Sequence, residues 1–223
     1  MKNQIFIWFA VIWMLPAQTS DVDKLITNLL GETPLKEDLK ELCDGIGGRP
    51  TGSIANFKSI KWGLEKFQTA GVKVQKDAFR MPGLWLENES SAKISGAVSF
   101  EPKVVALTFS EGTHRSGIKA NLLDGGRGLK DDFERLGEKA KGKFVLIETD
   151  ELVDIDGLFK EYADAVGIED LAYNAGVKGI IYMSSRPMRL LYRHNASRSF
   201  DNILPMLVMA REDAKRCFRI LRN

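Results

Sequence analysis

Two histidines, His114 and His194, are the only imidazoles in this chain of 223 residues. A catalytic zinc ion needs three protein ligands, drawn from His, Asp, Glu or Cys, and an open position for water. Neither histidine begins a His-x-Asp or a His-Glu-x-x-His pattern. A Ser-His or Cys-His triad could include either one, but the chain has no Gly-x-Ser-x-Gly elbow to present the nucleophile. We therefore predict no catalytic residue and no metal ligand in this chain, and two surface histidines.

A phosphate-binding loop is suggested by Gly137 to Phe144, but the segment is one residue short of that motif. Phe144 stands where Ser or Thr would hold magnesium, and a phosphate loop runs from a strand into a helix, which is the reverse of the order here. We expect a turn from a helix into a strand, in which Gly142 and Lys143 precede a buried strand.

Two further loops have partial ligand-binding patterns. In the acidic run 150–157, Leu152 and Ala163 would occupy the first and twelfth positions of a calcium loop, where carboxylates are needed. We expect a solvated turn there. The glycine-rich segment 45–53 has Pro50 where a phosphate cradle needs glycine, so we expect a tight connection between helices with Arg49 projecting from it.

The first twenty residues have the three parts of a secretory signal. Lys2 is followed by an apolar run from Ile5 to Leu15 and then by small residues up to Ser20. Eleven residues are too few to cross a bilayer about 30 Å thick as a helix. We expect a signal peptide over residues 1–20 and a protein that is secreted or held in the lumen of the secretory pathway, including the lysosome; the alternative is an interfacial or buried N-terminal helix. Asn88 and Asn195 are then candidate glycosylation sites.

The balance of charge does not indicate a nucleic-acid or membrane partner. The 32 Lys and Arg residues, less Lys2 in the signal, leave 31 against 30 Asp and Glu residues. Basic residues do gather towards the C-terminus, where we expect a solvated basic face: Arg186, Arg189, Arg193, Arg198, Arg211, Lys215, Arg216, Arg219 and Arg222. Cys43 and Cys217 lie on the apolar faces of predicted helices, so we favour two buried free thiols over a bridge.

The spacing of apolar residues predicts two parts of different completeness. Residues 22–30, 33–45 and 54–67 are predicted helices, with Thr33 as an N-cap, and residues 72–79 are a predicted strand. One strand cannot cover three amphipathic helices, so a packing partner is missing or lies in the other half. Short strands are then expected at 92–94, 103–107, 118–122, 144–147, 179–183 and 204–209, with helices at 158–166, 169–175 and 214–221.

Three segments in order resemble the carboxypeptidase Q (plasma glutamate carboxypeptidase) type of zinc exopeptidase. The first, residues 42–53, is similar to that family's Gly-x-Arg-x-Thr-Gly-Ser segment. The second comprises residues 80–85 and 89–92. The third resembles a protease-associated domain in residues 117–120, 142–146, 175–181, 204–206 and 212–214.

The resemblance implies an α+β or α/β fold in two parts. Residues 21–92 would be an incomplete N-terminal segment of the peptidase domain, and residues 93–223 a protease-associated domain, barrel-like with helices. The complete enzyme would use two zinc ions to hydrolyse short peptides, could form a homodimer, and would take its metal ligands from residues that follow this segment. This chain alone would bind no zinc and be inactive. The alternative is a secreted binding module for a protein or peptide partner.

Overall fold

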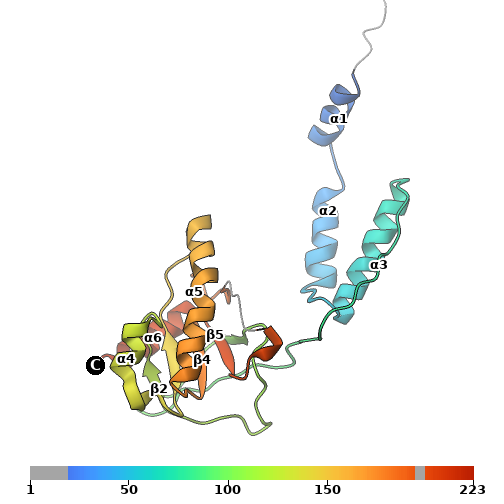
Figure 1. The fold of residues 1–223 in the computed structure, drawn as a ribbon. Coiled ribbons are helices and arrows are strands. Elements are labelled where there is room, and N and C mark those ends of the chain that lie inside the picture. The colour runs from blue at the N-terminus through green and yellow to red at the C-terminus, as the bar shows by residue number, and fades with distance from the viewer. Residues whose placement is uncertain (1–19, 194–198) are drawn as a thin grey trace, which may run out of the picture. The chain divides into compact units, whose positions relative to one another are not determined.

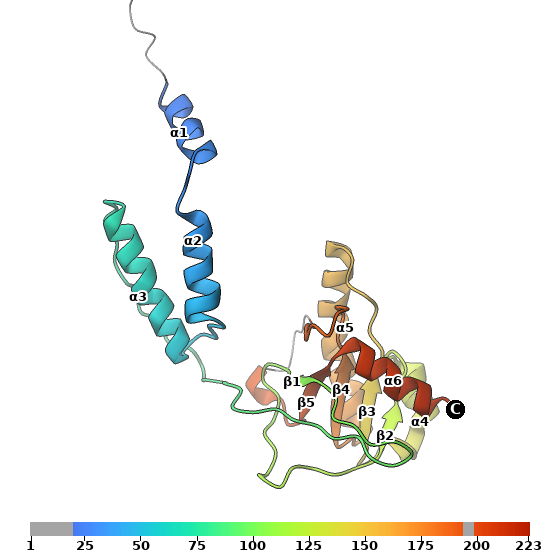
Figure 2. The same ribbon diagram turned by 180° about the vertical axis from the view of Figure 1, so that it is seen from behind.

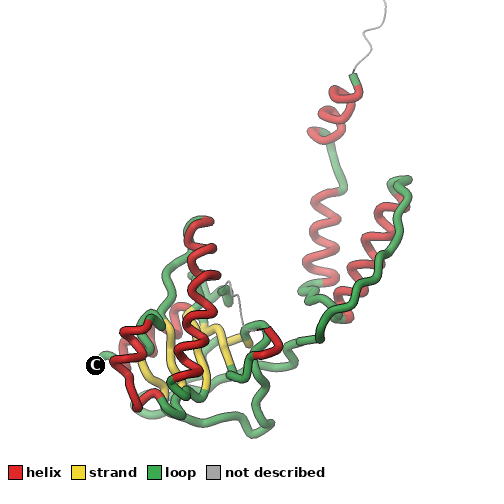
Figure 3. Tube along the Cα trace, viewed as in Figure 1, coloured by secondary structure: helices red, strands yellow, loops and turns green. Residues whose placement is uncertain are grey.

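A computed structural model describes residues 20–193 and 199–223, which form two compact units divided between Asp77 and Ala78. The expected signal peptide, except for Ser20, and the residues His194, Asn195 and Arg198 lie outside the described residues. Figure 3 shows helices in both units and strands in the second. Among the described residues, no helix combines the length and apolar character that a membrane span requires.

The first unit is built from helices, as its apolar spacing predicts. They are α1 (Asp21–Leu30), α2 (Leu35–Lys40), the π-helical turn η1 (Glu41–Ile46) and α3 (Ile54–Thr69). The side chain of Ser20 caps α1 by accepting a hydrogen bond from the backbone N–H of Asp23 (3.1 Å), and Ser53 caps α3 in the same way from Asn56 (3.0 Å). The second helix begins at Leu35 with Pro34 at its N-cap, one residue later than Thr33 would place it.

Polar contacts join α3 to the turn before it. The indole Nε1 of Trp62 donates to a carboxylate oxygen of Glu41 at 2.7 Å, and Lys66 Nζ lies 2.7 Å from Asp38 and 2.8 Å from Glu41. Arg49 does not project from its loop as expected. Its Nη1 donates to the carbonyl oxygens of Leu42 (2.9 Å) and Gly47 (2.8 Å), so it closes the end of η1.

Two predictions for the first unit are wrong. Residues 72–79 form no strand, because an extended segment becomes a strand only by pairing with another, and no partner strand lies beside it among the described residues. Cys43 is exposed instead of buried. Both outcomes have the same cause, which is that the helices of this unit enclose no core. None of the residues in α1, α2, η1 or α3 is buried.

The second unit is a three-layer α/β domain around a five-stranded sheet. Its strands are β1 (Val104–Ala106), β2 (Leu122–Asp124), β3 (Phe144–Ile147), β4 (Gly179–Met183) and β5 (Met206–Met209), in the order β1-β5-β4-β3-β2. Strands β2 to β5 are parallel, and β1 runs antiparallel to β5. The expected barrel-like closure is wrong for the described sheet, because β1 and β2 occupy its opposite edges.

Helices cover both faces of the sheet. Helices α4 (Lys130–Leu136) and α5 (Ile155–Asn174) lie on one face, and α6 (Arg211–Leu221) lies on the other (Figures 1 and 2). The short 3₁₀ turns η2 (Gly137–Ala140) and η3 (Ser199–Asp201) complete the unit. Alternate residues of one strand enter the two cores: Val145 and Ile147 of β3 pack on the α4 and α5 side, and Leu146 on the α6 side.

The predicted elements of this unit are confirmed where apolar runs are continuous. Strands β3 and β4 have the predicted bounds, β5 lies within the predicted range, and the last helix is present. The predicted strand at 92–94 is reduced to one bridge between Ile94 and Phe100, and β2 lies later than predicted, at 122–124. The two helices predicted at 158–166 and 169–175 are the single helix α5, because Gly167 continues the helix instead of interrupting it.

Candidate functional site

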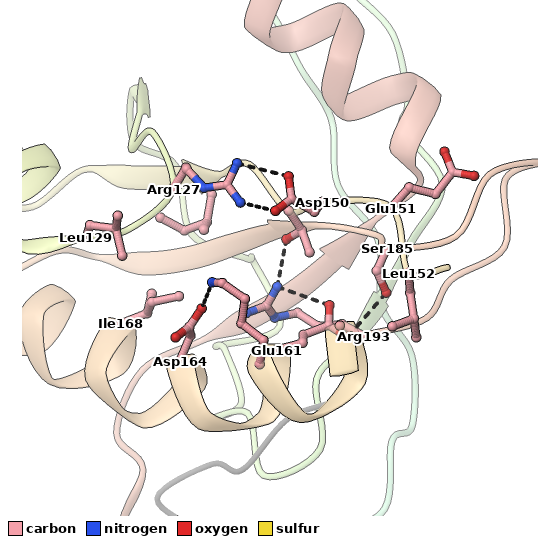
Figure 4. A pocket seen from close by; sticks show the side chains of 14 residues that line it. Arg127, Leu129, Asp150, Glu151, Leu152, Glu161, Asp164, Ile168, Ser185 and Arg193 are labelled. Atoms are coloured by element: carbon pink, nitrogen blue, oxygen red, sulfur yellow. Dashed lines mark hydrogen bonds and ion pairs between the residues drawn. The ribbon is translucent and has the colours of Figure 1, made fainter. Parts of the chain in front are cut away.

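A hollow in the second unit lies between α5 and the carboxyl ends of β3 and β4 (Figure 4). This edge of a parallel sheet is where α/β proteins commonly place ligands. The pocket has a volume of about 80 Å³, which suits a few water molecules but not a peptide. It is lined by Arg127, Leu129, Ile147, Thr149, Asp150, Glu151, Leu152, Gly157, Lys160, Glu161, Asp164, Ile168, Ser185 and Arg193.

A buried ion pair forms the floor of this pocket. Arg193 Nη1 donates to the hydroxyl of Thr149 at 2.7 Å and lies 3.4 Å from Glu161 Oε1. The Arg193 guanidinium also stacks on the ring of Tyr182, 4.1 Å from its centroid. Burial raises the pKa of the Tyr182 hydroxyl, so this side chain stays neutral at physiological pH. The floor thus joins α5, the end of β3 and the loop that follows β4.

Two further ion pairs lie at the more exposed rim. Arg127 binds Asp150 through both guanidinium nitrogens, and the hydrogen bonds lower the pKa of Asp150 and raise that of Arg127. Lys160 pairs with Asp164 one turn later on α5. The charges at the rim are therefore largely satisfied by the protein itself.

Arg211 holds the neighbouring strand ends together. Its Nη1 donates to the carbonyl oxygens of Thr149 (2.8 Å) and Ser184 (3.1 Å), which follow β3 and β4. Arg211 is buried, and the side chain of Arg193 is only 3% exposed. The expectation of a solvated basic face is therefore wrong for these two residues, because each is drawn inward by oxygen acceptors at the end of the sheet.

Other residues of the basic segment have defined partners as well. Arg222 binds Asp124 (2.7 Å) and Glu148 (2.7 Å), and Arg189 binds Asp213 (2.9 Å). Both arginines remain exposed, as the prediction of a solvated basic face requires, although carboxylates from distant parts of the sequence pair with them.

The pocket has a hydroxyl and a carboxylate but the described side chains do not form a recognisable reaction centre. Ser185 Oγ lies 3.4 Å from Glu161 Oε2 and donates at 3.2 Å towards the carbonyl oxygen of Tyr192. No group of three His, Cys, Asp or Glu side chains within residues 20–193 and 199–223 has the spacing to hold a metal ion. The geometry provides a polar hollow of about 80 Å³. The hydrogen bonds and ion pairs around it hold the loops at this edge of the sheet.

Part of the acidic run singled out from sequence, residues 150–152 and Gly157, lines this pocket, whereas His114, Gly142 and Lys143 do not. His114 is exposed, and its Nδ1 lies 2.8 Å from the hydroxyl of Ser116. Asp154 caps α5 by accepting from the N–H of Gly157 (2.8 Å), so the acidic run is a helix start. Gly142 and Lys143 form the predicted turn into β3. Asn88 is exposed, as glycosylation requires.

Sequence reasoning missed the buried pair of Glu161 and Arg193. The sequence did contain a signal for Glu161. Glu161 occupies the same helical face as Ala165, Ile168 and Ala172, four, seven and eleven residues later. A carboxylate on the buried face of a helix requires a partner, and the abundant arginines that follow β4 were the available cations.

Comparisons with known proteins identify the fold. No protein-family model matches the chain, and no curated protein matches its sequence. A zinc aminopeptidase from Bacillus subtilis is similar with a TM-score of 0.59 and 22% identity, over 82% of this chain and 40% of that one. A peptidase M28 precursor from Shewanella amazonensis SB2B is similar with a TM-score of 0.75 and 20% identity, over 90% of this chain and 46% of that one.

The chain therefore spans less than half of the length of either structure, while most of its own length is matched. The mixed α/β arrangement with its five-stranded, mostly parallel sheet resembles part of the M28 peptidase fold.

Proposed function

We propose that this chain is the N-terminal part of a secreted zinc exopeptidase of the carboxypeptidase Q type. In this proposal, residues 21–92 begin the peptidase domain and residues 93–223 are its protease-associated module. The observation that carries the proposal is the likeness over 90% of this chain to 46% of an M28 peptidase structure. The order of sequence segments that resemble carboxypeptidase Q supports the narrower assignment.

The first unit supports the same conclusion through its uncovered apolar faces. Leu25 of α1 is 58% exposed and Phe57 of α3 is 65% exposed, and both lie on apolar helix faces. Burial of such side chains typically stabilises a protein by roughly 1.5–3 kcal/mol each. Helices with these faces form stably when a sheet or other helices cover them, and their own unit supplies no such cover. In the proposed enzyme, the remainder of the peptidase domain covers them.

The proposed chemistry belongs to the complete enzyme. Its zinc ions would polarise the peptide carbonyl and activate a water molecule for hydrolysis. The described residues do not fit such a centre, because they include no group of three suitable ligands. We therefore assign no catalytic step to this chain and expect it to be inactive alone.

The role proposed for the second unit is to cover the substrate cleft and restrict it to short peptides. This unit has two buried cores of its own, one on each face of the sheet. A domain with an independent core can act as a rigid cover, whereas the first unit depends on a partner for its core.

A peptide-hydrolysis assay tests the proposal. The purified full chain would be incubated with dipeptides, an N-blocked dipeptide and an amino-acid anilide, with zinc, with a chelator and with neither. We expect no hydrolysis above a zinc-only blank. Chelator-sensitive hydrolysis by the chain alone would contradict the proposal that its metal ligands lie elsewhere.

The second candidate function is a secreted module that binds a protein or peptide. The complete pair of cores in residues 78–223 favours it. The two functions differ in what they require of the first unit. Strong binding of a dye that reports exposed apolar surface, lost when Leu25, Leu29 and Phe57 are replaced by Glu, favours the partial enzyme. A monomer that binds no dye favours the module.

A further inference from the structure

The outer face of α6 has a charge pattern that differs from those of α3, α4 and α5 (Figure 2). On each of those three helices an exposed lysine pairs with a carboxylate one turn later: Lys61 with Glu65, Lys130 with Glu134 and Lys160 with Asp164. On α6, Lys215 is followed one turn later by Arg219, and both are exposed. Like charges at this spacing slightly destabilise a helix. The helix macrodipole favours a cation in the last turn, where Arg219 lies, but does not account for Lys215 in the middle of the helix.

A third cation on this face is held in place by an aromatic ring. The guanidinium of Arg216 lies 4.1 Å from the centroid of the Phe100 ring, and this cation–π contact fixes its position. Phe100 in turn packs against the core between α6 and the sheet. Among the described residues, no carboxylate pairs with the side chain of Lys215, Arg216 or Arg219. Three exposed cations with free donors therefore lie at neighbouring positions of one helix face.

The carboxylates near this face are engaged by other groups. The Glu212 carboxylate accepts from two successive backbone N–H groups of the loop after β4, at 2.8 and 3.1 Å. Asp213 pairs with Arg189 at 2.9 Å. Exposed Glu101 is offset by exposed Lys93, because the bridge between residues 94 and 100 brings their segments together. The outer face of α6 therefore keeps the charge of its three cations.

A sulfated polysaccharide fits this face better than other polyanions do. Its sulfate oxygens accept the forked hydrogen bonds that a fixed guanidinium offers, and basic clusters are typical of heparin-binding surfaces. A single-stranded nucleic acid needs aromatic rings that are open to its bases, but Arg216 covers Phe100. A membrane surface needs apolar side chains that enter the lipid beside the cations. The apolar residues of α6 between these cations face the core instead: Ala214, Cys217 and Phe218.

We infer that the outer face of α6, formed by Lys215, Arg216 and Arg219, binds a sulfated polysaccharide. The helix rises about 6 Å between Lys215 and Arg219, so the cations follow one another along a line, as sulfate groups do along such a chain. Phe100 is a positioning residue that acts through Arg216. This inference goes beyond the proposed function and does not use peptidase activity, so either can fail without the other.

Binding of labelled heparin over a series of salt concentrations tests the contact. Each cation that neutralises a charge on a linear polyanion releases roughly one counterion. The full chain with Lys215→Gln and Arg219→Gln is therefore expected to bind about tenfold or more weakly at about 100 mM salt, and to lose roughly 1.5–2 from the slope of log K against log salt. Lys139→Gln with Lys141→Gln, which removes two exposed lysines before β3, is the matched control and should leave affinity and slope unchanged.

A further variant separates the placement of the cations from their number. Phe100→Leu keeps every charge but removes the ring on which Arg216 stacks. It is expected to weaken heparin binding about two- to fivefold, the value of an exposed cation–π contact, with an unchanged salt slope. The buried thiol of Cys217 lies in the core beside Phe100, so its protection from a thiol reagent shows that each variant is folded.

Competing probes identify the partner. Desulfated heparin, polyglutamate, single-stranded and duplex DNA, and vesicles of anionic phospholipid are compared with heparin at equal salt. We expect heparin to bind more tightly than each of them. Absence of heparin binding at about 50 mM salt, equal binding of desulfated heparin, tighter binding of DNA or vesicles, or equal losses in the two double variants would overturn the inference.

Discussion

Arg193 Nη1 lies 3.4 Å from Glu161 Oε1, and the two side chains are only 3% and 5% exposed, respectively. This pair ties the middle of α5 to the loop that follows β4. Because a buried charge that loses its partner is costly, the pair fixes the chain path at the carboxyl edge of the sheet. The pairs of Arg127 with Asp150 and of Lys160 with Asp164, at the rim of the same pocket, involve more exposed side chains.

Arg193→Met is expected to destabilise the protein by about 3–5 kcal/mol, since it leaves the Glu161 carboxylate without this cation. The double variant with Glu161→Leu is expected to lose less than the sum of the single losses, by about 1 kcal/mol or more. Urea unfolding measures all three. Lys160→Met breaks an exposed pair and is expected to change stability by less than about 1 kcal/mol. Strict additivity of the two buried substitutions would contradict the coupling.

The ion pair of Asp124 with Arg222 predicts a loss of stability in acid. Burial raises the pKa of Asp124, but hydrogen bonds from Arg222 and from the backbone of Gly126 outweigh this and hold the pKa below 3.8. The unfolded chain therefore binds this proton more readily than the folded chain. The stabilisation is complete above the unfolded pKa and is lost as the pH falls through the folded pKa.

Arg222→Gln is expected to flatten the dependence of unfolding free energy on pH between about pH 5 and pH 3, because the folded and unfolded pKa values of Asp124 then converge. Lys215→Gln, at an exposed position of α6, the helix that ends just before Arg222, serves as the control and should retain the slope of the unaltered chain. Urea denaturation over a pH series gives the slopes. An unchanged slope for Arg222→Gln would show that this pair does not contribute.

The two cysteines are expected to differ in reactivity. Burial and the nearby Asp213 raise the pKa of Cys217 to about 11, so its thiolate fraction at pH 8 falls about 100-fold relative to a thiol at the ordinary value of 9.0. Cys43 is exposed. Ellman's reagent should therefore titrate one thiol per native chain and a second only after unfolding. Two rapidly reacting thiols in the native protein would contradict the burial of Cys217 between α6 and the sheet.

Two glycines should respond in opposite directions to a methyl group. At Gly179, a Cβ atom would lie 2.6 Å from the carbonyl oxygen of Pro205 and 2.7 Å from the ring of Phe144. Gly179→Ala is therefore expected to destabilise the protein by about 1–3 kcal/mol. At Gly167 the space is open, so Gly167→Ala in dilute solution should stabilise it by about 0.5–1 kcal/mol through helix propensity. Equal effects at the two positions would contradict the described packing.

The elements that were predictable from sequence are those whose partners lie within this chain. Residues 144–147 and 179–183 are apolar on every position, and both form central strands of the sheet. The last helix presents Ala214, Cys217 and Phe218 to the core as its spacing predicts. Local pattern sufficed here because the same chain supplies the covering layers.

Where prediction failed, the missing information was the identity of the partner. Residues 72–79 have a strand-like pattern but no neighbouring strand in the described chain. Arg193 and Arg211 carry the charge of surface residues, yet acceptors 32 to 62 residues away draw them inward. Single-sequence periodicity contains no information about such distant pairs, so the pocket that Arg193 lines could not be foreseen.

Zinc stoichiometry tests the central claim most directly. Metal analysis of the purified 223-residue chain after equilibration with zinc and gel filtration measures the ions retained per molecule. The account predicts fewer than about 0.1 tightly bound ions, because the ligands of the proposed centre come from outside this chain. Retention of one or two ions per chain, at a site lost on substitution of its own side chains, would contradict it.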